Sequence, residues 1–297
     1  MDGGSLFLQQ FINGLSLGSI YALIALGYTM VYGIAKMLNF AHGDVIMVGA
    51  YLIYVVSTMQ GLPIWVGILA SVVGCTVLGM VIERLAYKPL RGAQSLAVLI
   101  TAIGVSYFLQ NAALLIFGSS PKSFTSVINK KPISLFDGAL VISWEAILTM
   151  IVSILIMVAL TVFINKSKQG KAMRAASEDR DAAQLMGINV NRTITLTFAI
   201  GSALAAVAGM LLCSSYPTLT PYTGAMPGIK AFTAAVFGGI GSIPGAMLGG
   251  VLIGIIQMLA NGYISTQLSD AIVFAVLIIV LLVKPTGLLG KKINEKV

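Results

Sequence analysis

The residues with the clearest potential for chemistry form one short polar stretch, Asn39 to Asp44, which interrupts an apolar region. The stretch holds His42, the only histidine in the chain, and Asp44, and these residue types could serve as a general base and its partner. Their spacing of two residues does not place them on one face of a helix. No serine elbow, histidine-rich zinc pattern or HExxH motif accompanies them. We therefore expect no catalytic residues and no metal site.

Two interpretations of this stretch remain open. Ionisable side chains inside a membrane usually line a transport path or stabilise an irregular turn. Asn39, His42 and Asp44 therefore either brace a break in a helix, which we favour, or contact a transported substrate. Lys36 lies just before the stretch and could neutralise Asp44.

Chemistry on nucleotides is not expected of this chain. It contains no GxxxxGK[ST] loop, so any ATP that drives it must be bound by other chains, and no cofactor is expected here. Cys75 and Cys213 both fall in apolar segments and predict neither a disulfide framework nor a metal site. The start, Met1 to Gly4, lacks basic residues, so a cleaved signal peptide is not expected.

The elements that hold these residues must be membrane helices. Of 297 residues, 58% are hydrophobic and only 9% are charged, whereas soluble domains average about 25% charged. A soluble fold could not cover so much apolar surface, so lipid must be the solvent. The formal charge of +8 would suggest nucleic acid in a soluble protein. The positions of the basic residues point instead to a membrane protein, with no nucleic acid as partner.

Segments of about 20 apolar residues can cross a bilayer as helices. We therefore predict an all-α polytopic membrane protein, a single domain over 1–297 with about eight transmembrane segments. Seven of them are predicted at 6–32, 41–59, 62–82, 94–117, 143–164, 193–213 and 270–284.

Lysine and arginine predict the orientation, because they are enriched in cytoplasmic loops. Fourteen of the 18 basic residues fall on one predicted side, so the N-terminus is expected outside and the C-terminus in the cytoplasm. The cytoplasmic group is Lys36, Arg84, Lys88, Arg91, Lys166, Lys168, Lys171, Arg174, Arg180, Arg192, Lys284, Lys291, Lys292 and Lys296. The outer group is Lys122, Lys130, Lys131 and Lys230.

The stretch 229–260 must then begin and end on the outside. It is apolar but interrupted by Gly241, Ser242, Pro244 and Gly245. A re-entrant helical hairpin that turns at 242–245 satisfies this, and broken helices often border a translocation path. The alternative is one kinked span, with the C-terminal tail outside.

Small residues predict close helix packing, which lipid-embedded helices need because apolar burial does not drive their association. The main interpretation is packing within the chain, and the other is contact with a second membrane subunit. The pairs with four-residue spacing are Gly14/Gly18, Gly241/Gly245, Gly245/Gly249 and Gly250/Gly254, and Gly201, Ala205 and Gly209 share one face of another helix.

The longest charged loop, 166–192, is predicted to form one or two short helices. Gly187 suits a left-handed position just after a helix, with Ile188 as its apolar partner. A slim, charged helix below the membrane either docks into a groove of a soluble partner or is a solvated connector. The candidate docking residues are Arg174, Glu178, Asp179, Arg180, Asp181 and Gly187.

These motifs, taken in order, resemble the permeases of branched-chain amino acid ABC transporters, and specifically their H-type subunit. The resemblance covers nearly the whole chain. It rests on Asn13-Gly14-Leu15, Tyr21 to Ile34, Asn39 to Asp44, Glu83-Arg84 with Tyr87-Lys88-Pro89 and Arg91, Arg174-Ala175 with Ser177-Glu178-Asp179, Lys230 to Val236, Gly238 to Ala246, and Lys284 to Gly287.

The resemblance implies one subunit of a prokaryotic inner-membrane importer for leucine, isoleucine and valine. Its expected partners are an M-type permease, two cytoplasmic ATPases, an extracytoplasmic amino-acid-binding protein and membrane lipid. It also favours docking of 171–187 onto an ATPase. Related permeases carry urea, short amides or other amino acids, so the solute stays open.

Two other classes of membrane protein share some of these features, and the sequence argues against both. A passive channel or a secondary transporter also uses broken helices, but a coupled carrier usually needs acidic residues at mid-membrane. Asp44, Glu145 and Asp270 all lie near predicted span ends. An intramembrane enzyme would need a catalytic set that the sequence does not show.

Overall fold

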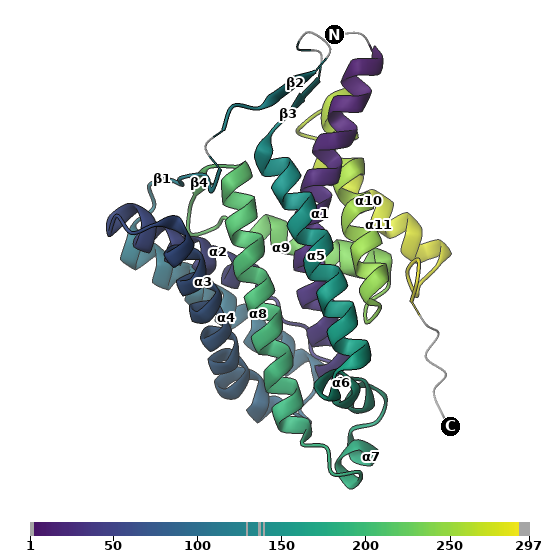
Figure 1. Ribbon diagram of the computed structural model, residues 1–297. Helices are drawn as coiled ribbons and strands as arrows, with labels where there is room; N and C mark the ends of the chain where they lie inside the picture. The colour runs from purple at the N-terminus through teal and green to yellow at the C-terminus, as the bar shows by residue number, and fades with distance from the viewer. Residues whose placement is uncertain (1–2, 129, 136–137, 139, 291–297) are drawn as a thin grey trace.

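The structure is a computed structural model that describes residues 3–128, 130–135, 138 and 140–290. Long helices lie side by side in a bundle, and two short strand pairs sit at one end (Figure 1). Within the described residues, seven helices are long and apolar enough to cross a membrane. The predicted class, an all-α polytopic membrane protein, is confirmed.

Six of the seven predicted spans, from 6–32 to 193–213, agree to within a few residues with helices long enough to cross a membrane. The seventh, 270–284, corresponds to the shorter helix α11 of 15 residues, and α10 is the remaining helix of membrane length. Residues 55–59 (η1) and 83–87 (η2) continue α2 and α3 as π-helical turns, and Lys88–Leu90 (η3) is a 3₁₀ turn. The helices are α1 (Gly3–Ala35), α2 (His42–Tyr54), α3 (Ile64–Ile82), α4 (Ser95–Phe117), α5 (Trp144–Lys166), α6 (Lys168–Glu178), α7 (Arg180–Leu185), α8 (Val190–Ser215), α9 (Ala225–Gly238), α10 (Ile243–Tyr263) and α11 (Ser269–Val283).

Short polar side chains define where several helices begin. The Oγ of Ser143 accepts a hydrogen bond from the amide of Ala146 and starts α5, and Ser167 starts α6 in the same way. The Oδ1 of Asn189 accepts from the amide of Arg192 and starts α8. Each residue satisfies an amide that the helix itself leaves unpaired.

The first helix is the centre of the bundle, because it packs directly against α10. Gly14 of α1 lies against Ile255, and Gly18 lies against Val251, so the two helices run antiparallel. A Cβ on Gly250 would collide with the backbone of Ala22. The phenol of Tyr263 donates to the carbonyl of Gly3 over 3.2 Å. The predicted packing within the chain is confirmed for these pairs.

The helices at the outside of the bundle, α3, α4 and α5, expose apolar side chains. Only 22% of the most apolar window in α3, α4 and α5 is buried, against 89% in α1. Side chains such as Val73, Phe108 and Leu155 are more than half exposed. Such faces suit lipid, whereas α1 suits a protein interior.

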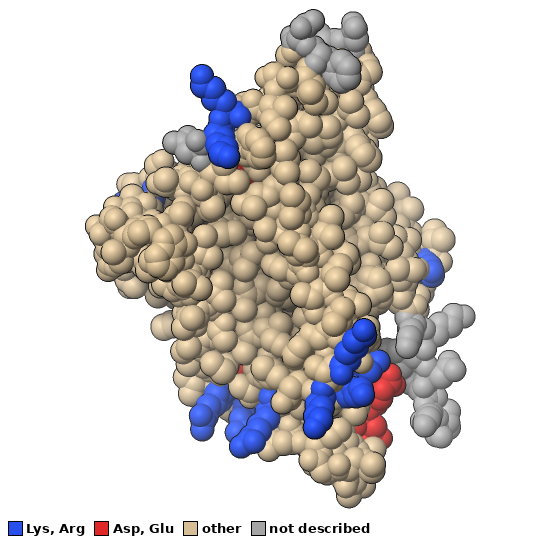
Figure 2. All heavy atoms as spheres, viewed as in Figure 1, with Lys and Arg blue, Asp and Glu red and all other residues tan. Residues whose placement is uncertain are grey.

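The two ends of the bundle differ in charge and in structure. At the strand end, β1 (Lys122–Ser123) pairs antiparallel with β4 (Thr218–Leu219), and β2 (Ile133–Leu135) pairs with β3 (Leu140–Ile142). Opposite lie α6 and α7, and Figure 2 shows blue side chains gathered at this α6–α7 end. Lys291, Lys292 and Lys296 of the predicted cytoplasmic group lie outside the described residues.

The stretch 229–260 forms two antiparallel helices, which contradicts a single kinked span. Gly249 of α10 packs against Ala234 of α9, and Gly245 packs against Gly238. The arms are unequal: the 14 residues of α9 extend about 21 Å, whereas the 21 residues of α10 extend about 31 Å and can cross a bilayer.

Candidate functional site

The polar stretch predicted to break a helix does so inside the bundle. The first helix ends at Ala35, and α2 begins at His42. The imidazole of His42 lies against Gly27 of α1, where a Cβ would collide with it, and 4.8 Å from the ring of Tyr28 between centroids. Since Gly27 precedes Ala35 by eight residues, the chain turns back by about 12 Å before α2 starts.

The three polar side chains of this break are buried and point to different helices. The Oδ1 of Asn39 accepts a hydrogen bond of 2.9 Å from the phenol of Tyr87, next to the end of α3. The Oδ1 of Asp44 accepts one of 2.8 Å from the amide of Gln110 on α4. His42 instead faces α1. Asn39, His42 and Asp44, at the start of α2, therefore contact three different helices, and their role in bracing the break stays a prediction.

One expectation about charges near the break is wrong. Lys36 is exposed and Asp44 is buried against Gln110, so the two do not neutralise each other. Asp44 lies near the end of a candidate span, His42–Met59, as expected, and this end starts inside the bundle.

The start of α9 lies beside the start of α2, a pairing that the sequence analysis did not predict. Gly224, just before α9, lies so close to Gly43 that a Cβ would overlap the carbonyl of Gly43. Gly228 packs on the same glycine, and Phe232 packs on the rings of Tyr28 and Phe40. The four-residue glycine spacing of 224 and 228 was the available signal.

The turn between α9 and α10 lies three residues earlier than predicted. Gly239 and Gly241 have φ values of 107° and 92°, the left-handed region that favours glycine. The Oγ of Ser242 accepts from the amide of Gly245 over 3.2 Å and starts α10. Pro244 and Gly245 therefore belong to the first turn of α10. The turn lies beside Gly33, near the end of α1.

The predicted short helices of 166–192 are confirmed as α6 and α7. Asp179 separates them: its Oδ1 accepts from the amides of Asp181 and Ala182 and starts α7. Gly187 has φ 82°, and the amide of Ile188 donates to the carbonyl of Ala183. This is the predicted helix end with glycine in the left-handed region.

The candidate docking residues do not all face outward. Glu178, Asp179 and Asp181 are exposed, and Arg174 reaches Asn165 on α5 over 3.4 Å. Arg180 instead turns inward and donates to the carbonyl of Ala35 at the end of α1. Burial and the nearby charge of Arg91 lower the pKa of Arg180 from its ordinary value.

Two apolar side chains of this region are almost fully exposed. Leu185 is 90% exposed and Met186 is 82% exposed, directly at the end of α7. The docking residues were predicted from the charges of the loop, and this apolar pair was not among them. The sequence signal for this exposed pair was its position just before Gly187. A helix ends there, so these two apolar residues could not be buried by further turns of it.

Lys230 was predicted to lie in an outer region, but it belongs to α9 and is buried. Its Nζ lies 2.7 Å from the Oδ1 of Asp270 at the start of α11. The amide of Gln257 also approaches Asp270, at 3.4 Å, and accepts from the phenol of Tyr21. This polar chain connects α1, α9, α10 and α11.

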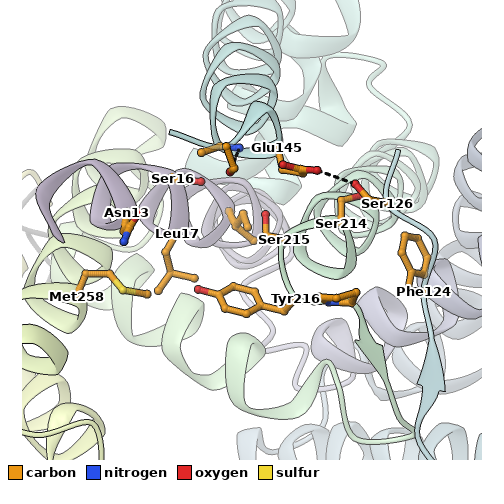
Figure 3. A pocket seen from close by; sticks show the side chains of 14 residues that line it. Asn13, Ser16, Leu17, Phe124, Ser126, Glu145, Ser214, Ser215, Tyr216 and Met258 are labelled. Carbon is orange, nitrogen blue, oxygen red and sulfur yellow. Dashed lines mark hydrogen bonds between the residues drawn. The ribbon is translucent and has the colours of Figure 1, made fainter. Parts of the chain in front are cut away.

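A cavity of about 600 Å³ opens at the strand end of the bundle (Figure 3). No single stretch of sequence forms it, so sequence analysis could not predict it, although Glu145 was noted as an acid near a span end. The lining residues come from α1, α5, α8, α10 and the loops beside β1 and β4: Asn13, Ser16, Leu17, Ile20, Phe124, Ser126, Ser143, Glu145, Ala146, Ser214, Ser215, Tyr216, Pro217 and Met258.

Comparison with known proteins identifies the family. The family described as "Branched-chain amino acid transport system / permease component" matches residues 10–281. The chain belongs to this family. The branched-chain permease family thus accounts for nearly all of the bundle, from the first turns of α1 to the end of α11.

Relatives within this permease family match over the full chain. The high-affinity branched-chain amino acid transport system permease protein LivH of Escherichia coli K12 is 50% identical, covering 98% of both chains. BraD of Pseudomonas aeruginosa, which carries the same description, is 48% identical with the same coverage. A probable LivH of Methanocaldococcus jannaschii is 31% identical, covering 92% of this chain and 89% of the relative.

Proposed function

We propose that this chain is the H-type permease subunit of an ATP-driven importer that carries leucine, isoleucine and valine across the cytoplasmic membrane of a prokaryote. The observation that carries the proposal is the match to the branched-chain permease family over 10–281, joined to relatives about half identical over the full chain. The expected partners are an M-type permease, two ATPases that bind ATP, and an extracytoplasmic amino-acid-binding protein. This chain itself would bind no cofactor.

The orientation follows from the charge at the two ends. The basic side chains gathered at the α6–α7 end favour the cytoplasm on that side, and the strand end then faces outward. A cysteine placed at Lys130 should react with an impermeant maleimide in intact cells, and one at Arg192 should react only after lysis. Labelling of position 192 from outside would reverse the orientation.

The pair α6–α7 supports docking onto an ATPase. The exposed Leu185 and Met186 stand at its tip, and the exposed Glu178 ends α6. An apolar tip in water is costly to leave exposed, and its burial in a groove would stabilise a complex by about 25 cal/mol for each Å². A partner groove on the ATPase therefore explains why the residues lie there.

The same pair reaches the break at the centre of the bundle. Arg180 holds the end of α1 through the carbonyl of Ala35, and the next residues lead back to Asn39 and His42. The residues of α6 also border a cavity of about 80 Å³ next to Gly241, at the α9–α10 turn. A shift of α6–α7 on ATP binding would thus act on both irregular segments.

Reconstitution into liposomes tests the function. Together with its partner permease, both ATPases and the binding protein, the chain should support ATP-dependent uptake of labelled leucine that isoleucine and valine inhibit. The chain alone should carry nothing. Uptake by the chain alone would indicate a channel or secondary transporter, and uptake of urea or amides in place of leucine by the complex would indicate one of the related permeases.

A further inference from the structure

The cavity at the strand end plays no part in the coupling path described above. Its volume of about 600 Å³ lies within the usual range of small-molecule sites, about 300–1,000 Å³. Four helices and two loops contribute to its walls, so its shape depends on the whole outer half of the bundle. Under the proposed orientation it opens to the side from which substrate arrives.

One wall carries a carboxylate without a cationic partner. The Oε1 of Glu145, at the start of α5, accepts a hydrogen bond of 3.0 Å from Ser126. No lysine or arginine among the described residues forms an ion pair with it. The Nζ of Lys130 lies 5.2 Å from the ring centroid of the neighbouring Trp144. An uncompensated carboxylate at a cavity wall attracts an ammonium group.

Two further polar groups of the lining can donate hydrogen bonds. The Oγ of Ser215 is buried and has no hydrogen-bond partner among the described residues. The Oδ1 of Asn13 accepts from Gln9, which leaves its Nδ2 as a donor towards the cavity. Figure 3 shows Ser215 between Glu145 on one side and Tyr216 on the other. Buried donors without partners are rare in proteins, and a ligand carboxylate would satisfy them.

An apolar wall completes the cavity. Leu17 and Ile20 of α1 are buried to 5% and 0% exposure, and Met258 of α10 lines the same side. Figure 3 places Leu17 and Met258 together, away from Glu145. The arrangement thus offers an acid, hydroxyl and amide donors, and an aliphatic surface within one space.

We propose that this cavity binds a free amino acid with an aliphatic side chain as it enters the permease. The ammonium group lies on Glu145, the carboxylate on Ser215 and Asn13, and the side chain on Leu17 and Met258. The proposal rests on the proposed function and names a substrate site within it. A neutral solute such as urea would leave the carboxylate of Glu145 unpaired.

Thiol labelling tests the site without relying on transport. Pro217→Cys places a reporter on the cavity wall, and Lys131→Cys places a matched reporter on the same end, outside the lining. The native Cys75 and Cys213 are buried. In the purified complex, millimolar L-leucine should slow maleimide labelling of position 217 and leave position 131 unaffected. The analogue 4-methylpentanoate, which lacks the ammonium group, should not protect.

The decisive variant is Glu145→Gln in the Pro217→Cys background. Loss of a charge-assisted hydrogen bond should raise the leucine concentration needed for protection by about tenfold to a hundredfold. Unchanged protection in Glu145→Gln, equal protection by 4-methylpentanoate, or no protection by leucine would each overturn the site. Protection by leucine without leucine uptake by the reconstituted complex would contradict the proposed function and leave the cavity site standing.

Discussion

The centre of the bundle and the pair α6–α7 are held in place by opposite means. At the centre, α1 touches α10, α2 and α8 through glycines, and a Cβ on Gly250, Gly254 or Gly27 would collide with its neighbours. At the α6–α7 end, the tip residues Leu185 and Met186 contact solvent. The centre is thus complete within one chain, whereas the tip of α7 is not.

This difference teaches where each kind of change should act. Interiors packed at close range have no space for additional atoms, so a substitution at the centre disturbs folding itself. A substitution at an exposed tip leaves the fold intact and alters only the contact with a partner. Gly250→Leu at the centre and Leu185→Ala with Met186→Ala at the tip test this contrast directly.

Gly250→Leu should have the largest effect. The added side chain collides with the backbone of Ala22, which cannot move without displacing α1. Overpacking typically costs about 1–3 kcal/mol, and more where the neighbour is backbone. We expect little folded protein by size-exclusion chromatography and a large fall in melting temperature. Gly104→Leu on α4 is the matched control: its Cβ meets nothing within 4 Å, so normal yield is expected. Equal yields of the two variants would contradict the packing argument.

Leu185→Ala with Met186→Ala should leave the fold intact and weaken ATPase binding. Burial of one large apolar side chain stabilises by about 1.5–3 kcal/mol. Truncating two should therefore reduce affinity by roughly 100-fold or more. Recovery of the ATPase on a tagged permease in detergent measures this. Leu115→Ala, at an 86% exposed position on the opposite end, should recover as much ATPase as wild type. Full recovery with the double variant would place the docking surface elsewhere.

Arg180→Gln should separate docking from transport. The guanidinium joins α7 to the end of α1 and does not face the expected partner. We expect nearly normal ATPase recovery but about tenfold to a hundredfold less leucine uptake for each ATP hydrolysed. Arg174→Gln, which loses only the weaker contacts to Asn165, should have little effect on that ratio. If both variants take up similar amounts of leucine for each ATP hydrolysed, the contact of Arg180 with the end of α1 does not couple hydrolysis to transport.

Much of the fold could be predicted because hydropathy in a membrane protein reports directly on helices. The span 94–117 was predicted to within one residue, and the observed helix is Ser95–Phe117. The hairpin was predicted from the charges and the glycines of the sequence. Its turn was placed three residues too late, and it lies at 239–242. The position was ambiguous because a proline such as Pro244 suits the first turn of a helix as well as a loop.

Contacts between distant residues could not be predicted. The approach of Gly224 to Gly43 and the ion pair of Lys230 with Asp270 depend on how helices far apart in sequence lie together. The inward direction of Arg180 is of the same kind: a charged loop pattern gives no information on which side chain reaches back to Ala35.

The smallest expected effect is that of substituting Asp179. This residue could act as a helix cap, as a packed residue would, or as a charge that contacts a partner, as an exposed residue would. Its carboxylate starts α7 by accepting from the amides of Asp181 and Ala182, and it is also exposed. Asp179→Ala removes both the cap and the charge, whereas Asp179→Asn keeps an oxygen that can cap the helix. Loss of a cap costs about 1 kcal/mol, roughly a fivefold change in the helix population.

If capping is the main role, hydrogen exchange of 180–186 should quicken in Asp179→Ala only, and ATPase recovery should fall modestly in that variant alone. If Asp179→Asn loses as much ATPase as Asp179→Ala without faster exchange, the charge itself contacts the partner. The exposed acidic edge of α7 would then join Leu185 and Met186 in the docking surface.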